Sequence, residues 1–335
     1  MRLAVVGLGP RGREWIALAR AHGHDVAAAI DPKREARDAA SGIGVDPAIV
    51  FDTLAAARRD NSVDVIIVAT ALDTHITVAR EALAWRRPLL VEKPLALDFA
   101  SASAFVTEAD AAGVPVVVVQ NHRFVRHWRS LRAALRTLPL GIVDGVTIRR
   151  YRPLPPPSPA LEALRDAVLW ETIVHDVDAV RAVLGSELTW VQAEVSGVAW
   201  RPALPGTRAT ISAALANGLR MTYEVVWDTR GHEFFRGGDE LYVRVHAERG
   251  TVHMLYGWLI YCERGRWPRP LARAPRGELG EVTLLRQLGA DQTGSTPLLC
   301  SARDNLRTIA VLEACARSAA EGRRVNLADV YPDVS

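Results

Sequence analysis

The feature that most constrains the fold is a glycine-rich turn that follows the first apolar segment. Residues 3–6 (Leu-Ala-Val-Val) are typical of a buried strand, and the chain continues as Gly7-Leu8-Gly9-Pro10-Arg11-Gly12. In this G-x-G-x-x-G spacing, Gly7 allows a tight turn, Gly9 lets the backbone approach a pyrophosphate, and Gly12 lets the next helix pack on the strand. Pro10 falls in the first helical turn, where its missing N–H would be unpaired anyway. The pattern predicts a strand–turn–helix unit that binds a dinucleotide.

An acidic residue at the end of the next expected strand supports this interpretation. The strand Val26–Ile30 is followed by Asp31, about 20 residues beyond the glycines, where a carboxylate accepts hydrogen bonds from the adenosine ribose hydroxyls of NAD. A 2′-phosphate at that place would meet a like charge. Lys33, Arg34 and Arg37 follow closely and could instead attract such a phosphate. The sequence therefore favours NAD as the cofactor, with NADP as the alternative.

A second informative stretch is Leu89-Leu90-Val91-Glu92-Lys93-Pro94. Pro94 cannot continue a strand ladder, so Glu92 and Lys93 should lie at the carboxyl end of a strand, the edge at which open α/β sheets bind ligands. Only two of the 41 basic residues are lysines. A lysine at this edge indicates a need for an ammonium that exchanges a proton, which arginine does not do at ordinary pH. The alternative is a surface lysine before a turn.

Strands and helices alternate through the first 120 residues, which predicts parallel βαβ units with right-handed crossovers. The expected fold class is α/β, with an N-terminal doubly wound parallel sheet of the Rossmann type. Thr70 and Lys93 each follow a strand end and should line the same crevice as the glycine turn. His75 is expected at a helix N-terminus near that crevice, or as a packing residue of the first turn. The further elements are expected at Arg13–Ala21, Leu54–Arg59, His75–Trp85 and Ala100–Ala112 (helices) and at Val63–Ala69, Leu89–Val91 and Val114–Val119 (strands).

These motifs resemble the Gfo/Idh/MocA family of nicotinamide-dependent oxidoreductases, named for glucose-fructose oxidoreductase and inositol dehydrogenase. The matching segments are residues 7–12, Asp31, Thr70–His75, Val91–Leu95 and Asn121-His122-Arg123-Phe124. Ala71 departs from the family, which commonly has proline there. The resemblance implies a cis peptide bond at Lys93–Pro94. The expected cofactor-binding residues are Gly7, Gly9, Pro10, Arg11, Gly12, Asp31, Lys33, Arg34, Thr70, His75, Glu92, Lys93 and Asn121.

The regular alternation ends after Phe124, which predicts two domains. Residues 1–122 are expected to form the dinucleotide-binding domain, and residues 123–335 a substrate-binding and oligomerisation domain. The second domain is expected to be α+β, with a largely antiparallel, open-faced sheet. The proline-rich residues 153–159 are expected to form an extended surface connection, or alternatively to border the substrate cleft. The expected elements are strands at 143–152, 189–199, 209–215, 220–227, 240–246, 252–256 and 259–263, and helices at 128–138, 161–184 and 302–321.

The expected helix Leu161–Leu184 carries Glu171, His175 and Asp178. Glu171 and His175 are four residues apart and should share one side of the helix. A carboxylate beside a histidine orients the imidazole and stabilises its charged form, which suits a general base in alcohol oxidation or a general acid in reduction. A metal pair and a structural ion pair are the alternatives, and no metal is predicted because no third ligand set is recognisable. The family has aspartate where this chain has Glu171, which implies a changed substrate geometry.

The resemblance implies an NAD(P)-dependent oxidoreductase that moves a hydride between nicotinamide and a secondary alcohol or ketone of a sugar, cyclitol or related polar small molecule. The expected catalytic residues are Lys93, His175 and Glu171, and the expected substrate-binding residues are Lys93, Arg123, Glu171 and His175. Lys93 would stabilise negative charge on the reacting oxygen or donate the proton itself. Reduction of an imine or conjugated double bond, and a non-catalytic dinucleotide sensor or scaffold, are the alternative functions.

Composition bears on partners and location. The net charge is +3 and the basic residues are scattered, which argues against a nucleic-acid surface. No apolar run approaches the length of a membrane span, and three distant cysteines without a leader pattern fit a reducing cytoplasm. A large exposed apolar sheet face usually marks a protein–protein contact, so a homodimer or homotetramer through the C-terminal sheet is expected. The aromatic residues expected on that face are Trp190, Trp200, Tyr223 and Trp227.

Overall fold

The computed structural model describes residues 1–58, 62–154, 159–199, 204, 206–227, 239–289 and 297–332. The chain divides into two compact units. Unit 1 comprises Met1–Asn121 and Glu278–Ile309, and unit 2 comprises His122–Gly277 and Ala310–Ser335. The segment Glu278–Ile309 therefore packs with the N-terminal unit, which a single division of the chain after residue 122 does not include.

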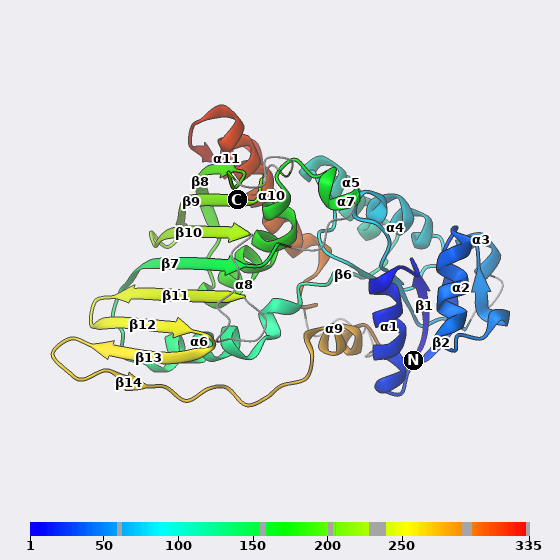
Figure 1. Ribbon diagram of the computed structural model, residues 1–335, viewed down its shortest axis with the longest axis horizontal. Helices are drawn as coiled ribbons and strands as arrows, with labels where there is room; N and C mark the ends of the chain where they lie inside the picture. Colours follow the sequence, from blue (N-terminus) through cyan, green and yellow to red (C-terminus); the bar gives the residue numbers. More distant parts are fainter. Residues whose placement is uncertain are drawn as a thin grey trace. The chain divides into compact units, whose positions relative to one another are not determined.

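Unit 1 is built on a six-stranded sheet with the strand order β3-β2-β1-β4-β5-β6. Figure 1 labels β1, β2 and β6 of this sheet. Every pairing in it is parallel. Each residue of the three strands β4, β5 and β6 is buried, as expected where helices cover both faces of a sheet. This is the doubly wound arrangement that the sequence predicts. The strands are β1 (Arg2–Val6), β2 (Asp25–Ile30), β3 (Val50–Phe51), β4 (Val65–Val68), β5 (Leu89–Val91) and β6 (Val116–Val118).

Helices connect these strands. Two begin with side-chain caps, because Thr53 accepts a hydrogen bond from the amide of Ala56 and Asp98 accepts one from the amide of Ser101. The helices of unit 1 are α1 (Pro10–Ala21), α2 (Arg34–Gly42), α3 (Leu54–Ala57), α4 (His75–Leu83), α5 (Phe99–Ala111), α9 (Gly280–Gly289) and the start of α10 (Ala302–Glu321), with the 3-10 turns η1 (Pro47–Ile49) and η2 (Leu72–Thr74).

Unit 2 contains a nine-stranded sheet with the order β14-β13-β12-β11-β7-β10-β9-β8-β15. Only the pairing of β10 with β7 is parallel among the described strands of this sheet. The sheet is therefore largely antiparallel, as the sequence predicts. The strands are β7 (Val143–Arg152), β8 (Leu188–Ser196), β9 (Arg208–Leu215), β10 (Arg220–Trp227), β11 (Glu240–Ala247), β12 (Gly250–Leu255), β13 (Trp258–Glu263), β14 (Arg269–Pro270) and β15 (Val325–Asn326).

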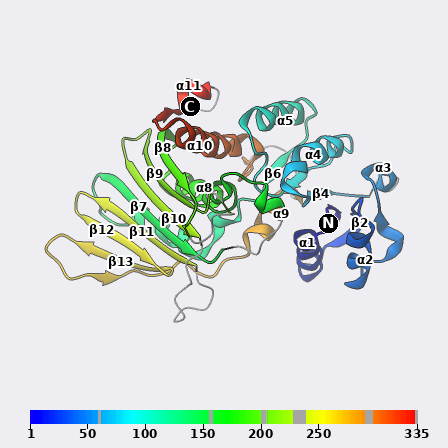
Figure 2. The same ribbon diagram turned by 45° about the horizontal axis from the view of Figure 1, so that its top comes forward.

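One face of this sheet is covered by helices, and α8 lies along it in Figure 2. The hydroxyl of Tyr223 donates to Asp176 on α8, and Nε1 of Trp227 donates to Thr172. The expectation that Tyr223 and Trp227 populate the bare face is therefore wrong, because the alternation along β10 turns both inward. The helices of unit 2 are α6 (Arg126–Thr137), α7 (Pro159–Glu162), α8 (Val174–Leu184), α11 (Leu327–Val330) and the end of α10, with the 3-10 turn η3 (Asn121–Phe124) and the π-helix η4 (Leu169–Ile173).

The single helix expected over residues 161–184 is broken. It divides into α7, a non-helical stretch, and the π-helix η4 that continues into α8. The amide of Val168 donates to the carbonyl of Gly206, so a neighbouring segment takes the place of a helical acceptor. This break places Glu171 in the π-helical turn and His175 in the first turn of α8, so the two expected catalytic residues lie in different helical segments. Single π-helical turns occur frequently at functional sites.

Two other expectations fall beyond the limits of the described residues. Trp200 and residues 155–158 of the proline-rich segment lie outside them. Trp190 is half-buried, with the guanidinium groups of Arg220 and Arg324 over its ring. None of the helices in the described ranges has the length and apolar content that crossing a bilayer requires.

Candidate active site

The glycine turn between β1 and α1 has little room for side chains. Gly7 has φ +91°, and a Cβ atom there would lie 2.5 Å from the carbonyl oxygen of Ala69. A Cβ atom on Gly12 would lie 1.7 Å from the carbonyl oxygen of Gly7. Both positions therefore require glycine. A Cβ atom on Gly9, by contrast, would meet no heavy atom within 4 Å, so this part of the turn faces open space.

Asp31 orders the same turn from the end of β2. Its Oδ2 accepts a hydrogen bond from the amide of Leu8 and its Oδ1 one from the amide of Lys33, both at 2.8 Å. The guanidinium of Arg37 donates to the carbonyls of Asp31 and Pro32. The side chains of Lys33 and Arg34 are exposed.

These features fit a dinucleotide. The N-terminus of α1 has no side-chain cap, and an uncapped helix N-terminus offers amides and a favourable dipole to a phosphate. The open side of Gly9 leaves space for such a group to approach the backbone. The Asp31 carboxylate lies at the end of the neighbouring strand, where ribose hydroxyls are bound in such folds.

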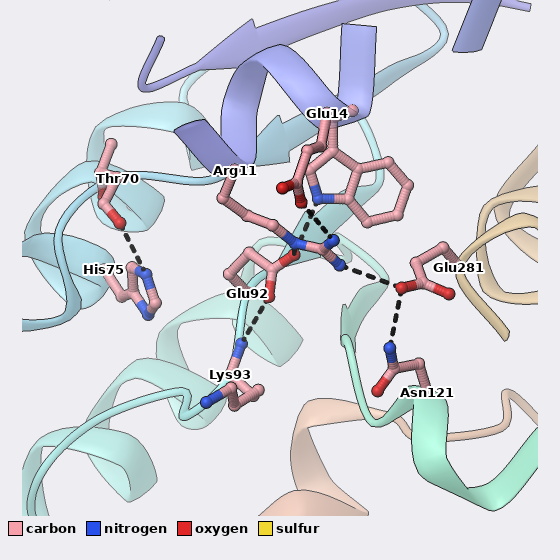
Figure 3. A network of polar contacts seen from close by, with 9 residues as sticks. Arg11, Glu14, Thr70, His75, Glu92, Lys93, Asn121 and Glu281 are labelled. Carbon is pink, nitrogen blue, oxygen red and sulfur yellow. Dashed lines mark hydrogen bonds and ion pairs between the residues drawn. The ribbon is translucent and has the colours of Figure 1, made fainter. Parts of the chain in front are cut away.

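Glu92 is buried at the carboxyl end of β5 and bridges two parts of unit 1 (Figure 3). Its Oε1 accepts hydrogen bonds from Nε of Arg11 at 2.5 Å and from Nε1 of Trp15 at 2.8 Å. Its Oε2 lies 3.3 Å from the amide nitrogen of Lys93. Glu92 thus ties the glycine turn to the Lys93 backbone. The Lys93–Pro94 peptide is cis, as the resemblance implies.

The guanidinium of Arg11 contacts three carboxylates. Besides Glu92, it donates to Glu14 at 3.0 Å and to Glu281 at 3.1 Å. Burial acts to lower the pKa of Arg11, but the carboxylates, Glu92 foremost, raise it on balance. Arg11 is therefore held by protein groups rather than turned toward open space.

Glu281 also holds Asn121. Its Oε1 accepts a 2.7 Å hydrogen bond from Nδ2 of Asn121 (Figure 3). The start of α9 lies so close to this residue that a Cβ atom on Gly280 would be 2.7 Å from the Asn121 carbonyl oxygen. Sequence reasoning missed Glu281, because it lies 160 positions from Asn121 and belongs to no recognisable motif.

His75 is buried beside the same edge. Nδ1 lies 2.8 Å from the carbonyl oxygen of Pro94, and Nε2 lies 3.2 Å from that of Thr70. Burial lowers the pKa of His75, which favours a neutral ring whose single N–H donates to one of these two carbonyls. The ring braces two loops that follow β4 and β5. Thr70 is half-buried, and its hydroxyl oxygen accepts a 3.0 Å hydrogen bond from that of Thr74.

In unit 2, His175 stacks on His122. The ring centroids are 4.0 Å apart and the planes differ by 18°. Glu171 precedes His175 by four residues, in the π-helical turn. Arg123 donates two hydrogen bonds, at 2.5 and 2.6 Å, to Asp178. The guanidinium of Arg123 is thereby engaged by a buried carboxylate.

Asp176 is the buried centre of a second network in unit 2. Its carboxylate accepts hydrogen bonds from Nη1 of Arg150 at 2.6 Å and from the Tyr223 hydroxyl at 2.5 Å. Nδ1 of His122 lies 3.8 Å from it. Burial alone would raise the pKa of Asp176, but the Arg150 guanidinium holds it below its usual range. Arg150 also binds Asp239. No local pattern marks these residues, because they meet only through sheet pairing and helix packing.

The predicted site residues thus fall into two sets. Unit 1 brings Arg11, Glu92, Lys93 and Asn121 into one network that includes Glu281, while Lys33 and Arg34 point to solvent. Unit 2 holds the second set: Arg123, Glu171 and His175. Within the described ranges, no three His, Cys, Asp or Glu side chains are grouped so as to hold a metal ion.

Two family models match this chain. Residues 1–120 match an oxidoreductase family described by its NAD-binding Rossmann fold, and residues 128–253 match the GFO/IDH/MocA C-terminal domain. The chain belongs to the Gfo/Idh/MocA family of oxidoreductases. The Gfo/Idh/MocA assignment agrees with the resemblance drawn from the motifs, and its N-terminal model describes NAD as the bound cofactor.

Relatives of this Gfo/Idh/MocA chain include sugar and cyclitol dehydrogenases. It is 31% identical over 195 residues to inositol 2-dehydrogenase 1 of Paenarthrobacter aurescens, a match that covers 57% of this chain and 56% of the relative. It is 25% identical over 292 residues to D-apiose dehydrogenase of Rhizobium rhizogenes, covering 83% of each. The match thus covers little more than half the length of that inositol dehydrogenase and of two others from related bacteria.

The fold also has close structural counterparts. An oxidoreductase from Agrobacterium radiobacter, solved with NAD+, L-tartaric acid and magnesium, aligns with a TM-score of 0.86 over 98% of this chain and 99% of that one. The sequence identity is 20%. At this identity the likeness establishes the fold of the Gfo/Idh/MocA chain and nothing further.

Proposed function

We propose that this chain is an NAD-dependent dehydrogenase that interconverts a secondary alcohol and a ketone of a cyclitol, a sugar or a related polar small molecule. The position of Lys93 carries the proposal. This lysine follows β5 at the edge of the sheet that also holds the glycine turn after β1, and its backbone is fixed by Glu92. The activities for which two relatives are named, inositol and D-apiose dehydrogenation, supply the substrate class.

The residues of unit 1 would hold the cofactor. The uncapped start of α1 and the open side of Gly9 suit its pyrophosphate, and Asp31 suits the adenosine ribose. NAD, when bound, exchanges a hydride with the substrate carbon. Lys93 would hold the reacting oxygen and stabilise the negative charge that develops on it, with proton donation by Lys93 itself as the alternative role.

The residues of unit 2 would handle the proton. His175 is half-buried in the first turn of α8, and a histidine exchanges a proton readily near neutral pH. It would take the hydroxyl proton during oxidation and return it during reduction. Glu171, one turn earlier, would balance the charge that His175 gains.

Four expected contact residues receive bracing roles in this proposal. Glu92 and His75 are buried, and their polar atoms face protein groups. Nδ2 of Asn121 is bound to Glu281. Arg123 would likewise act through Asp178. These residues would shape the loops around cofactor and substrate rather than touch the reacting atoms.

Cofactor binding is the first test. The purified protein is titrated with NADH and, separately, with NADPH, and energy transfer from its nine tryptophans to the reduced nicotinamide is followed. We expect saturation by NADH and weaker binding of NADPH. A panel of cyclitols and aldoses is then screened for NADH formation from NAD+. Binding of neither cofactor would refute the proposal, and binding without turnover on any polyol would refute the substrate class.

We further propose that two copies associate through the open face of the nine-stranded sheet. Cross-strand pairing places Leu255 beside Trp258, and Ile260 lies next on the same face. Their exposed fractions are 45%, 63% and 41%, an apolar patch that association would cover. Sedimentation at micromolar concentration should give a dimer or tetramer, and Ile260→Asp should weaken it. Trp267→Asp is the control, because Trp267 is exposed outside the strands. A monomeric wild type would refute this proposal.

A further inference from the structure

His122 is a histidine to which neither the motifs nor the proposed mechanism gives a role. It lies in η3, directly after Asn121, and its ring stacks on His175 with centroids 4.0 Å apart. On its other side, Nδ1 lies 3.8 Å from Oδ1 of the buried Asp176. His122 therefore connects the proton-exchanging histidine of the proposed mechanism to a buried carboxylate.

We propose that His122 is a positioning residue for His175, which fixes the plane of the His175 ring by stacking and couples its charge to the buried Asp176–Arg150 pair. The proposal rests on the proposed role of His175 and deepens it. Stacking constrains the orientation of the His175 ring, and a proton acceptor must be oriented before it can react efficiently.

The charges of the two histidine rings are coupled because the rings are close together. Two positive charges 4.0 Å apart repel each other in a partly buried site, so a proton on one ring disfavours a second proton on the other. Nδ1 of His122 lies 3.8 Å from Oδ1 of Asp176, so a charge on His122 would have the buried carboxylate beside it. A charge on His122 would in turn favour the neutral, proton-accepting form of His175.

Every charged neighbour of the pair bears on this balance. Asp176 from α8 favours a charge on His122, and Arg150 from β7, which is bound to Asp176, opposes it. Glu171, one turn before His175, favours a charge on His175 instead. Asp239 before β11 offsets Arg150, and the Tyr223 hydroxyl on β10 donates to Asp176. His127 on α6 also faces His122; burial, and then the positive charge of His122, lower the pKa of His127, so it stays neutral and adds no charge.

The experiment compares two substitutions that separate the two parts of the role. His122→Phe keeps a flat ring for stacking and removes the titratable group, whereas His122→Leu removes both. For His122→Phe we expect turnover within about threefold of wild type at high pH, and an acidic limb of kcat/KM that lies roughly one pH unit higher. For His122→Leu we expect kcat to fall by about tenfold or more at every pH. His22→Phe, at an exposed histidine of unit 1, is the control and should match wild type.

A second readout does not depend on turnover. The ring resonances of His175, assigned by their loss in His175→Gln, are titrated by NMR in wild type and in His122→Phe. We expect the His175 titration to move upward by roughly one pH unit in the variant. An unchanged titration together with an unchanged pH profile would overturn the proposal. Failure of the proposed function would look different, because turnover would be absent in wild type while the His175 titration still responded to His122.

Discussion

The Glu92 carboxylate accepts a 2.5 Å hydrogen bond from Nε of Arg11, although the two residues lie 81 positions apart. Arg11 belongs to the glycine turn and Glu92 to the end of β5. The bond joins the turn expected to hold a pyrophosphate to the lysine expected to hold the reacting oxygen. A substitution of Arg11 or Glu92 should therefore change both the free energy of unfolding and the catalytic rate.

Arg11→Ala should destabilise unit 1. The substitution leaves the carboxylate of Glu92 buried without its guanidinium partner, which costs several kcal/mol when both partners are fully buried. Arg11 is 39% exposed, so we expect a smaller loss, about 1–3 kcal/mol in the free energy of unfolding. Urea denaturation measures it. Arg34→Ala, at a side chain that is 82% exposed, is the control and should change stability by less than about 0.5 kcal/mol. Equal effects of the two substitutions would contradict the ion-pair interpretation.

Lys93→Ala should separate catalysis from cofactor binding. Removing the ammonium takes away a stabilising charge at the reacting oxygen, so we expect kcat to fall by roughly a hundredfold or more, while the dissociation constant for NADH changes less than about threefold. Steady-state kinetics and the fluorescence titration measure the two quantities. Lys93→Arg keeps the charge without a readily exchanged proton. High activity of that variant would assign Lys93 to charge stabilisation, and a loss as large as in Lys93→Ala would favour proton transfer. Collapse of NADH binding in Lys93→Ala would make the role of Lys93 structural.

Much of unit 1 follows from local sequence signals. The glycine turn, the apolar strands and their alternation with helices each act within a few residues, so the parallel doubly wound sheet and its ligand-binding edge could be anticipated. Glu281 could not, because its contacts to Arg11 and Asn121 depend on a segment that returns to unit 1 after about half of the chain. Their positions in the sequence give no reason to expect Glu281 to contact Arg11 or Asn121.

The second unit was less predictable for two physical reasons. The helix expected over residues 161–184 has adequate periodicity, but a tertiary hydrogen bond from Val168 to Gly206 replaces a helical one, and tertiary contacts override propensity. The sequence also does not show which face of the sheet the aromatic side chains of β10 occupy, because aromatic residues suit either a core or an interface. Tyr223 and Trp227 are turned inward by polar partners, Asp176 and Thr172, that no sequence pattern links to them.

Asp31→Asn should weaken the preference for NADH over NADPH. An asparagine keeps one oxygen acceptor for the turn amides but loses the charge that favours ribose hydroxyls and repels a 2′-phosphate. Because a hydrogen bond to a charged group contributes about 1.5–3 kcal/mol, we expect the NADH affinity to fall by roughly tenfold and the NADPH affinity to fall less or to rise. Paired fluorescence titrations test this. Asp25→Asn, at the exposed start of β2, is the control. An unchanged ratio would show that Asp31 serves the turn alone.

His127 should make unit 2 sensitive to acid. It is half-buried on α6, with its ring against Trp128. Burial, with the positive charges of His122 and Arg150 adding to it, lowers the pKa of His127 from 6.5 to about 4, although Asp176 and Asp239 act in the opposite direction. Between these two pH values the unfolded chain binds a proton that the folded chain does not bind.

The free energy of unfolding should therefore fall as the pH drops below about 6.5, and the contribution of His127 should level off below about pH 4. At about pH 5 this single group accounts for a loss of roughly 2 kcal/mol. Other buried histidines, His75 among them, add to the total, so the test is a difference between variants. Urea unfolding at about pH 7 and about pH 5 should show a smaller loss in His127→Phe than in wild type, by roughly 2 kcal/mol, whereas His22→Phe should keep the full loss. An equal loss in His127→Phe and wild type would mean that His127 is protonated in the folded chain. The carboxylates of Asp176 and Asp239 would then have to raise the pKa of His127 by as much as burial lowers it.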